Sequence, residues 1–252
     1  SMLLDGKDVG EEVEVEVDEE SEVPHSESLV SYDVEEPSVH GSGEMEPTIR
    51  YPNGGHYVGE LNATGKRHGY GRMIYGAGDL LFGTAAAGDV YEGDWRQDLW
   101  QGFGTLRRVK GVVIKGHFAK GQIEGKAQFS TADNNFFFEG EHKRSLKHGR
   151  GSCRWGDGFS YDGEFKEGKR HGKGRFGFAD GGTYVGAFKD DQFHGKGIFT
   201  SAQGEKYEGT FVAGAMHGDM KVTTEHVRDA VHRYKQGEFV EYVKPGRPVL
   251  PS

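Results

Sequence analysis

The sequence is short of the components that build a thick hydrophobic core. Only 34% of its 252 residues are hydrophobic, and its one cysteine, Cys153, excludes an intrachain disulfide. No apolar run reaches the roughly 18 residues of a membrane-spanning helix, and the first residues lack the basic and apolar regions of a secretory signal. These absences argue against membrane-spanning and disulfide-stapled secreted proteins, and they predict a chain that works in a reducing, intracellular compartment.

Glycine and acidic charge are what the chain has in excess. Its 42 glycines follow no three-residue period, which excludes collagen. Residues 1–46 hold sixteen acidic residues against the single Lys7, a net charge of −15. Subtracting this value from the whole-chain charge of −9 leaves +6 for residues 47–252. A basic body therefore carries an acidic tail.

These composition shifts predict three regions: a largely disordered acidic tail (1–46), a repeat array (47–243) and a proline-containing C-terminal tail (244–252). One part of the acidic tail, Glu12–Asp18, reads E-V-E-V-E-V-D, an alternation typical of a half-buried strand. It has two open interpretations, a solvated acidic run or a segment that docks on the basic body. If the tail docks, deleting residues 1–46 should raise the affinity of the body for anionic ligands.

An internal repeat of about 23 residues sets the fold. In one copy, Tyr161, Gly163 and Phe165 form an aromatic-x-Gly-x-aromatic motif, and nine residues after Gly163 comes Gly172 of a His-Gly-x-Gly motif. Seven copies have their first motif centred on Gly59, Gly93, Gly116, Gly140, Gly163, Gly186 and Gly209, and a degenerate eighth copy is centred on Gly237. Such a constant register indicates one structural unit per repeat.

Each unit is interpreted as a β-hairpin, because alternate residues of a strand share one face and here combine glycine with aromatic rings. Asp157-Gly158 and Asp180-Gly181 are suited to positive φ in tight hairpin turns. The predicted fold is all-β, an elongated single-layer antiparallel sheet of stacked hairpins with a short C-terminal cap. Apolar spacing over 224–234 predicts an amphipathic helix, followed by a last strand over 237–243. An uncapped edge there would favour a homodimer.

The motif from Tyr207 to Phe211, preceded and followed by His-Gly pairs, resembles the MORN repeat (membrane occupation and recognition nexus). The resemblance covers about residues 51–243 and is best over 159–218. Copies with Ile114 or Phe138 in place of tyrosine, and with Ala127 in place of glycine, depart from it. The resemblance implies a twisted sheet with a groove, in a cytoplasmic, non-enzymatic scaffold at a cytoskeletal or ciliary structure.

No motif of a nucleophile, a phosphate loop or a zinc cluster is present, so we expect no enzymatic activity, cofactor or metal. Four histidines recur at 23-residue intervals, which spaces neighbours about 10 Å apart, too far for ligands of one ion. They are interpreted as hairpin-turn residues, with a stripe that titrates near pH 6.5 as the alternative. These histidines are His148, His171, His194 and His217.

Two surfaces are candidates for binding. A ladder of rings, left partly open by a single-layer sheet, would accept a helix or strand of a protein partner, unless the rings only pack the hairpins together. The ladder consists of Tyr161, Phe165, Tyr184, Phe188, Tyr207 and Phe211. A basic rim would attract anionic phospholipid, unless it is an ordinary solvated edge; it consists of Lys66, Arg67, Lys147, Lys169 and Arg170. Nucleic acid is not expected, because the aromatics are assigned to packing within the chain.

Overall fold

The computed structural model describes residues 49–81 and 84–249, and within them it contains strands and no helix. The strands are β1 (Ile49–Arg50), β2 (His56–Leu61), β3 (Arg67–Ile74), β4 (Leu80–Leu81), β5 (Thr84–Ala85), β6 (Val90–Arg96), β7 (Leu99–Arg107), β8 (Val113–Ala119), β9 (Gln122–Ser130), β10 (Phe136–Lys143), β11 (Leu146–Trp155), β12 (Ser160–Lys166), β13 (Lys169–Gly177), β14 (Thr183–Lys189), β15 (Gln192–Thr200), β16 (Lys206–Val212), β17 (Ala215–Thr223), β18 (Val227–Arg228), β19 (Ala230–Lys235), β20 (Glu238–Lys244) and β21 (Arg247–Pro248). In this described part, no helix could span a membrane.

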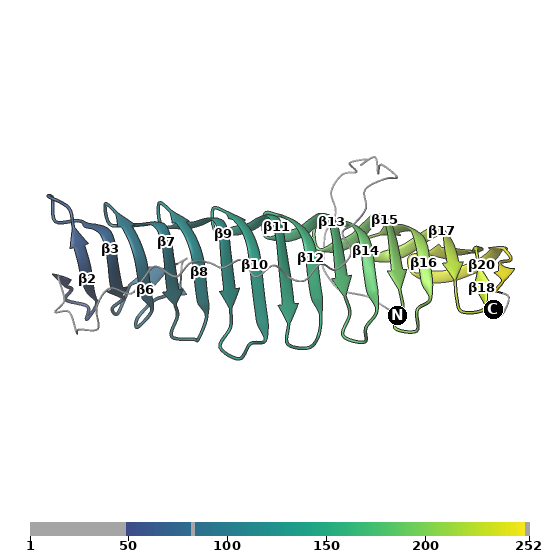
Figure 1. Cartoon of the computed structure of the whole chain (residues 1–252), viewed down its shortest axis with the longest axis horizontal. Coiled ribbons are helices and arrows are strands. Elements are labelled where there is room, and N and C mark those ends of the chain that lie inside the picture. Colours follow the sequence, from purple (N-terminus) through teal and green to yellow (C-terminus); the bar gives the residue numbers. More distant parts are fainter. Residues whose placement is uncertain (1–48, 82–83, 250–252) are drawn as a thin grey trace. The chain divides into compact units, whose positions relative to one another are not determined.

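Seventeen of the strands form one open antiparallel sheet in which each strand pairs with the next in sequence (Figure 1). The exceptions are two short two-stranded pairs, β4 with β5 and β18 with β21. The β4–β5 pair lies between β3 and β6, where the repeat glycines Gly59 and Gly93 are 34 residues apart instead of about 23. The sheet confirms the predicted all-β fold of elongated, stacked hairpins.

A tyrosine ring lying over two glycines is the packing unit of four of the hairpins, those of Tyr57, Tyr91, Tyr161 and Tyr184. Gly163 on β12 lies opposite Gly174 on β13, and the Tyr161 ring covers both. A Cβ added to Gly174 would lie 2.6 Å from Tyr161 ring atoms, so only glycine leaves room for the ring. The Tyr161 hydroxyl donates a hydrogen bond to the backbone oxygen of Glu164 at 2.8 Å. This contact explains why glycine and tyrosine recur together.

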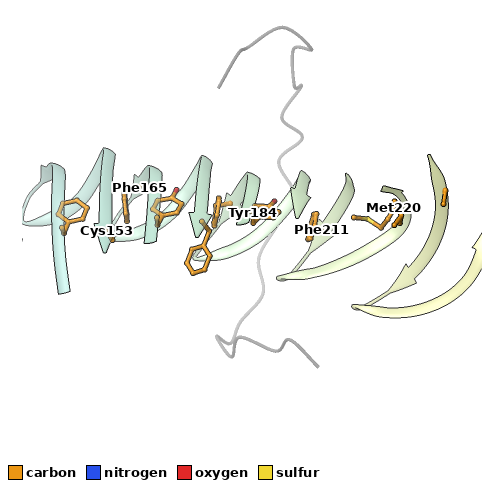
Figure 2. Close-up of a cluster of buried hydrophobic side chains, with 11 residues drawn as sticks. Cys153, Phe165, Tyr184, Phe211 and Met220 are labelled. Atoms are coloured by element: carbon orange, nitrogen blue, oxygen red, sulfur yellow. The ribbon is translucent and has the colours of Figure 1, made fainter. Parts of the chain in front are cut away.

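The core lies on one face of the sheet, along a row of apolar side chains with one from each strand of the main sheet except β20. Figure 2 shows part of this core, in which Cys153 on β11, Tyr184 on β14, Phe211 on β16 and Met220 on β17 are buried. Directly paired positions put the following residues in the row: Ile49, Tyr57, Met73, Tyr91, Leu106, Ile114, Phe129, Phe138, Cys153, Tyr161, Phe176, Tyr184, Phe199, Tyr207, Val222 and Ala230. We call this side the aromatic face.

Two kinds of turn alternate along the sheet. Two-residue turns such as Asp190–Asp191 have positive φ at both positions, 48° and 71°, as a type I′ hairpin requires. The N–H of Asp191 also donates to the Arg170 oxygen of the preceding hairpin at 3.0 Å. Three-residue loops such as 156–158 close with Gly158 N–H donating to the Trp155 oxygen at 3.0 Å. In that loop Gly158 has the positive φ expected of the Asp-Gly pair, 93°, whereas Asp157 does not, so only the glycine of the pair is left-handed.

The predicted helix over 224–234 is wrong, because this segment contains β18 and β19. The period-2 placement of Ala230, His232 and Tyr234 prevails over the helical spacing. Ala230 pairs with Val222 as Tyr184 pairs with Phe176 in an earlier repeat. Ala230 therefore anchors the eighth unit, and Gly237, with φ of 83°, is a turn residue between β19 and β20.

The last long strand ends at Lys244, just before Pro245, as expected. Beyond it, β21 extends strand structure to Pro248. The acidic tail, including Glu12–Asp18, lies outside the described residues. The region boundaries at 46 and 243 therefore stay predictions.

Candidate functional site

Five of the six ladder rings lie inside the array. Their exposed fractions are Tyr161 1%, Phe165 5%, Tyr184 0%, Phe188 3% and Phe211 3%. Each repeat covers the previous one, as where the Phe188 ring meets the Tyr161 ring edge-on with centroids 4.9 Å apart. The expectation of partly open rings is wrong for these five, because the glycines let each ring lie flat and the next repeat closes over it. A partner could contact them only through their neighbours.

Tyr207, the sixth ladder residue, is half-buried because Met220 takes the space over its glycine. A Cβ added to Gly209 would lie 2.4 Å from the Met220 sulfur, and Met220 is fully buried. The Tyr207 hydroxyl consequently bonds to the Glu205 carboxylate at 3.0 Å, whereas Tyr161 bonds to backbone. Tyr207 is thus the one predicted ladder residue whose ring remains accessible.

Other rings on the aromatic face are accessible, and apart from Tyr207 the sequence reasoning missed them as a site; Phe129, Phe199 and Tyr207 among them also belong to the core row. Phe178, for example, is half-buried and meets Phe159 and Phe199 with ring centroids 6.4 and 5.6 Å apart. We call the following half-buried residues the aromatic strip: Phe129, Phe136, Trp155, Phe159, Phe178, Phe199, Tyr207 and Tyr234. The signal in the sequence was a pair of aromatic residues two positions apart, Phe176 and Phe178, which share a face of the strand. In the structure the first is buried and the second is half-buried.

Three of the five predicted rim residues turn towards the aromatic face. The Arg67 guanidinium lies 4.4 Å from the Trp95 ring centroid, and the Lys147 ammonium lies 4.8 Å from that of Phe136. Arg170 lies 5.2 Å from the Phe176 centroid and pairs with Asp191 at 3.1 Å. Only Lys66 and Lys169 are exposed. The rim is therefore not a continuous line of five free positive charges.

The recurring histidines precede a β-bulge, not a hairpin turn as predicted. His171 comes just before Gly172, whose φ is 61°, inside β13. Across the bulge, the Lys173 N–H donates to the Glu164 carboxylate at 3.1 Å, and Glu60, Asp94 and Glu141 repeat this contact. No three metal-ligating side chains come together among the described residues. These histidines therefore belong to the hairpin framework.

Cys153 is part of the core row, between Phe138 and Tyr161. Burial raises the pKa of its thiol to about 11, so the reactive thiolate is scarce at neutral pH. This agrees with a structural role.

The repeat pattern and the hairpin geometry agree with a comparison against protein families. The MORN repeat model matches seven segments: 65–80, 91–113, 115–136, 138–160, 161–183, 184–206 and 207–218. The chain belongs to the MORN repeat family. In this MORN array the matched segments end before the eighth unit, in which Ala230 replaces the tyrosine.

No curated protein sequence matches the MORN array. Solved structures with some likeness include the TCP domain of Drosophila melanogaster SAS-4 (dCPAP) in complex with a proline rich motif of Ana2 (dSTIL). It is 11% identical with a TM-score of 0.39, and the match covers 73% of this chain and 93% of that one. The TCP10 domain of Danio rerio CPAP in complex with a peptide of STIL is 14% identical with a TM-score of 0.35, covering 77% and 92%.

Proposed function

We propose that the MORN array is a non-enzymatic scaffold that binds a protein partner through the aromatic strip. The observation that supports this proposal is a line of eight half-buried rings on one face of a single-layer sheet. Family resemblance adds a cytoplasmic setting at a cytoskeletal or ciliary structure to the proposal.

The strip has the physical character of a binding surface. Aromatic side chains bring large apolar area at a low cost in side-chain entropy, which is why they dominate the energy of protein interfaces. Ring contacts hold the strip in place before any partner arrives, as between Phe136 and Trp155 at 5.7 Å. A rigid apolar strip of this kind loses little freedom on binding and favours an extended or helical segment.

The test compares two full-length variants as baits for affinity purification with quantitative mass spectrometry. Phe159→Ser with Phe178→Ser removes two rings of the strip, and Tyr242→Ser removes a ring that is 74% exposed and outside it. We expect specific proteins to be captured by the natural chain and by Tyr242→Ser, and lost from the double variant. A photo-crosslinking residue at 159 should label those same proteins. Equal capture by a folded double variant would refute the proposal.

Two further predictions from the sequence remain proposals. An anionic-membrane tether would now depend on Lys66 and Lys169, because Arg67, Lys147 and Arg170 lie over rings. A homodimer would use β20, whose residues are all exposed. Two register shifts interrupt the pairing of β20 with β19, and bulges of this kind discourage pairing at a sheet edge.

A further inference from the structure

The sixth repeat is apolar at two positions on the face opposite the aromatic strip, where each of the other repeats has at least one charged side chain. The positions on either side of the central glycine point to that face, and they are acidic in three other repeats: Glu92 and Asp94, Glu139 and Glu141, Asp162 and Glu164. In the sixth repeat they are Val185 and Ala187. The array therefore contains its own internal reference for this substitution.

The departure does not serve the fold. In the preceding hairpin, the Glu164 carboxylate accepts the N–H of Lys173 at the bulge. Ala187, at the equivalent position, can offer no such acceptor to Lys196. A hydrogen bond from a charged acceptor contributes about 1.5–3 kcal/mol in general, less where it is exposed to water. The sixth repeat therefore has no carboxylate for this contact, as is also true of the third repeat with His117 and the seventh with Thr210, and it alone has apolar side chains on both sides of its central glycine.

A ring of basic residues surrounds these apolar side chains. Val185 pairs directly with Arg175 on β13 and with Ile198 on β15, which is 38% exposed. A shallow hollow of about 470 Å³ opens beside Ile198, and its charged lining residues are Lys206, Glu208, Lys221 and Arg228. We call the following residues the basic–aliphatic patch: Val185, Ala187 and Ile198 at its centre, and Lys173, Arg175, Lys196, Lys206 and Lys221 around them.

Charge on the patch is positive on balance. Its five cations face two carboxylates in the same rows: Asp162, which is paired with Arg175, and Glu208, which is paired with Lys221. The Glu164 carboxylate lies beside Lys173. Lys221 also meets Asp229 at 3.2 Å. In the described part of the chain, Arg175, Lys196 and Lys206 form no ion pair. The patch therefore offers aliphatic contact at its centre and a net positive charge at its margin.

We propose that the basic–aliphatic patch binds an extended protein segment in which aliphatic and acidic residues alternate. Alternate side chains of an extended segment are about 6.6–6.8 Å apart, the same spacing as Val185 and Ala187 on their own strand. The aliphatic side of the segment covers Val185, Ala187 and Ile198. Its carboxylates meet the long basic side chains, which bend over an apolar contact while keeping their charge at the edge.

The test measures binding of a labelled peptide by fluorescence anisotropy with the full-length chain. The probe has the sequence of residues 12–18, E-V-E-V-E-V-D, because this stretch has the required alternation. Val185→Asp with Ala187→Glu restores the carboxylates of the other repeats, so this variant should keep or raise the thermal midpoint. We expect it to weaken peptide binding at least about tenfold, or about 1.4 kcal/mol. Lys196→Glu with Lys206→Glu should weaken binding similarly.

Control peptides and a control chain make the outcome decisive. A peptide with serine in place of valine, or with lysine in place of glutamate, should bind at least about tenfold more weakly. The same assay is run on a chain with Val13, Val15 and Val17 changed to serine, so that no competing stretch is present. Peptide binding that depends on Val185 and Ala187, in the natural chain or in the control chain, supports the proposal. If the peptide binds neither of these chains, the proposal is overturned.

Two other results would also overturn the proposal. If the peptide with serine in place of valine binds as tightly as the valine peptide, the patch attracts acidic peptides only by non-specific charge. Capture of anionic phospholipid vesicles that depends on Val185 and Ala187, without peptide binding, would identify a lipid surface. The outcome is independent of the aromatic strip, because Phe159→Ser with Phe178→Ser alters the other face and should leave peptide binding unchanged.

Discussion

At the scale of single residues, His142 occupies the place that Phe165, Phe188 and Phe211 take in later repeats. Its ring meets Phe138 edge-on at 5.1 Å, as Phe165 meets Tyr161 at 5.1 Å. Its Nδ1 atom is buried without a hydrogen-bond partner in the described structure. A buried polar atom that lacks a partner costs about 1–3 kcal/mol. The fourth repeat is therefore a weak point of the core.

We predict that His142→Phe stabilises the array by about 1–2 kcal/mol at neutral pH, since it removes the unpartnered atom and keeps the ring contact. Burial lowers the pKa of His142 below its usual 6.5, although a contact with the Gly140 backbone opposes the shift; the charge of Lys147 adds a smaller lowering. As the pH falls, the unfolded chain therefore takes up the proton at this position before the folded chain does, and this favours unfolding. The stability of the folded chain that depends on a neutral His142 is present above pH 6.5 and is lost as the pH falls below it.

The check is thermal unfolding of the natural chain and His142→Phe at neutral pH and at about pH 5. The difference between their midpoints should widen at the lower pH. All other histidines are common to both chains, so the comparison isolates His142. A difference that shrinks on acidification would show that His142 is stabilised in its charged form, contrary to this argument.

At the scale of elements, the hairpins tolerate exceptions when two residues change together. In the third repeat Ile114 replaces the tyrosine, and Ala127 replaces the glycine that would lie under the tyrosine ring. In the second repeat, a Cβ on the equivalent Gly104 would lie 2.3 Å from the Tyr91 hydroxyl. The smaller isoleucine is what makes room for the methyl group of Ala127.

This pairing predicts a non-additive mutant cycle. Ile114→Tyr alone should destabilise the array by about 1–3 kcal/mol, because the ring meets the Ala127 methyl. Ala127→Gly alone should cost about 0.5–1 kcal/mol from glycine in a strand. The double variant restores the tyrosine-over-glycine unit and should be more stable than either single variant, with a coupling of at least about 1 kcal/mol. Urea unfolding measures all four chains, and additive effects would contradict the packing unit.

The elements also show how far sequence reasoning reaches. Glycine and aromatic residues in constant register predicted the hairpins and the open sheet, because each contact joins neighbours in sequence. Accessibility could not be predicted in the same way: Phe176 and Phe178 share a face, and only the stacking of the next repeat buries the first. Near Ala230, helical and strand spacings coexist, and pairing with β17 selects the strand. The spacing of the glycines also centred the eighth repeat on Gly237, which is a turn residue, whereas the strand of this repeat begins at Ala230.

At the scale of the whole molecule, charge separates the array from the segment that precedes it. Residues 1–46 carry −15 and residues 47–252 carry +6. The Debye length is about 8 Å at physiological ionic strength, so charges near a surface act only at short range. A basic residue held at an anionic membrane contributes about 1 kcal/mol. Two exposed rim lysines therefore cannot hold the full-length chain on an anionic membrane, because the membrane also repels the acidic residues of 1–46.

We therefore predict that the full-length chain does not co-sediment with anionic vesicles at physiological salt. A chain that begins at residue 47 keeps every described strand pair and should bind weakly, with binding lost at about 500 mM salt, where the Debye length falls below about 5 Å. Lys66→Glu with Lys169→Glu tests the rim, and Lys110→Glu is the control at an exposed loop lysine. Each charge reversal should weaken the vesicle binding of the chain that begins at residue 47 only in proportion to the charge that it changes. Salt-sensitive binding of the full-length chain, abolished by the rim reversal and unaffected by Lys110→Glu, would instead establish the rim as a membrane tether.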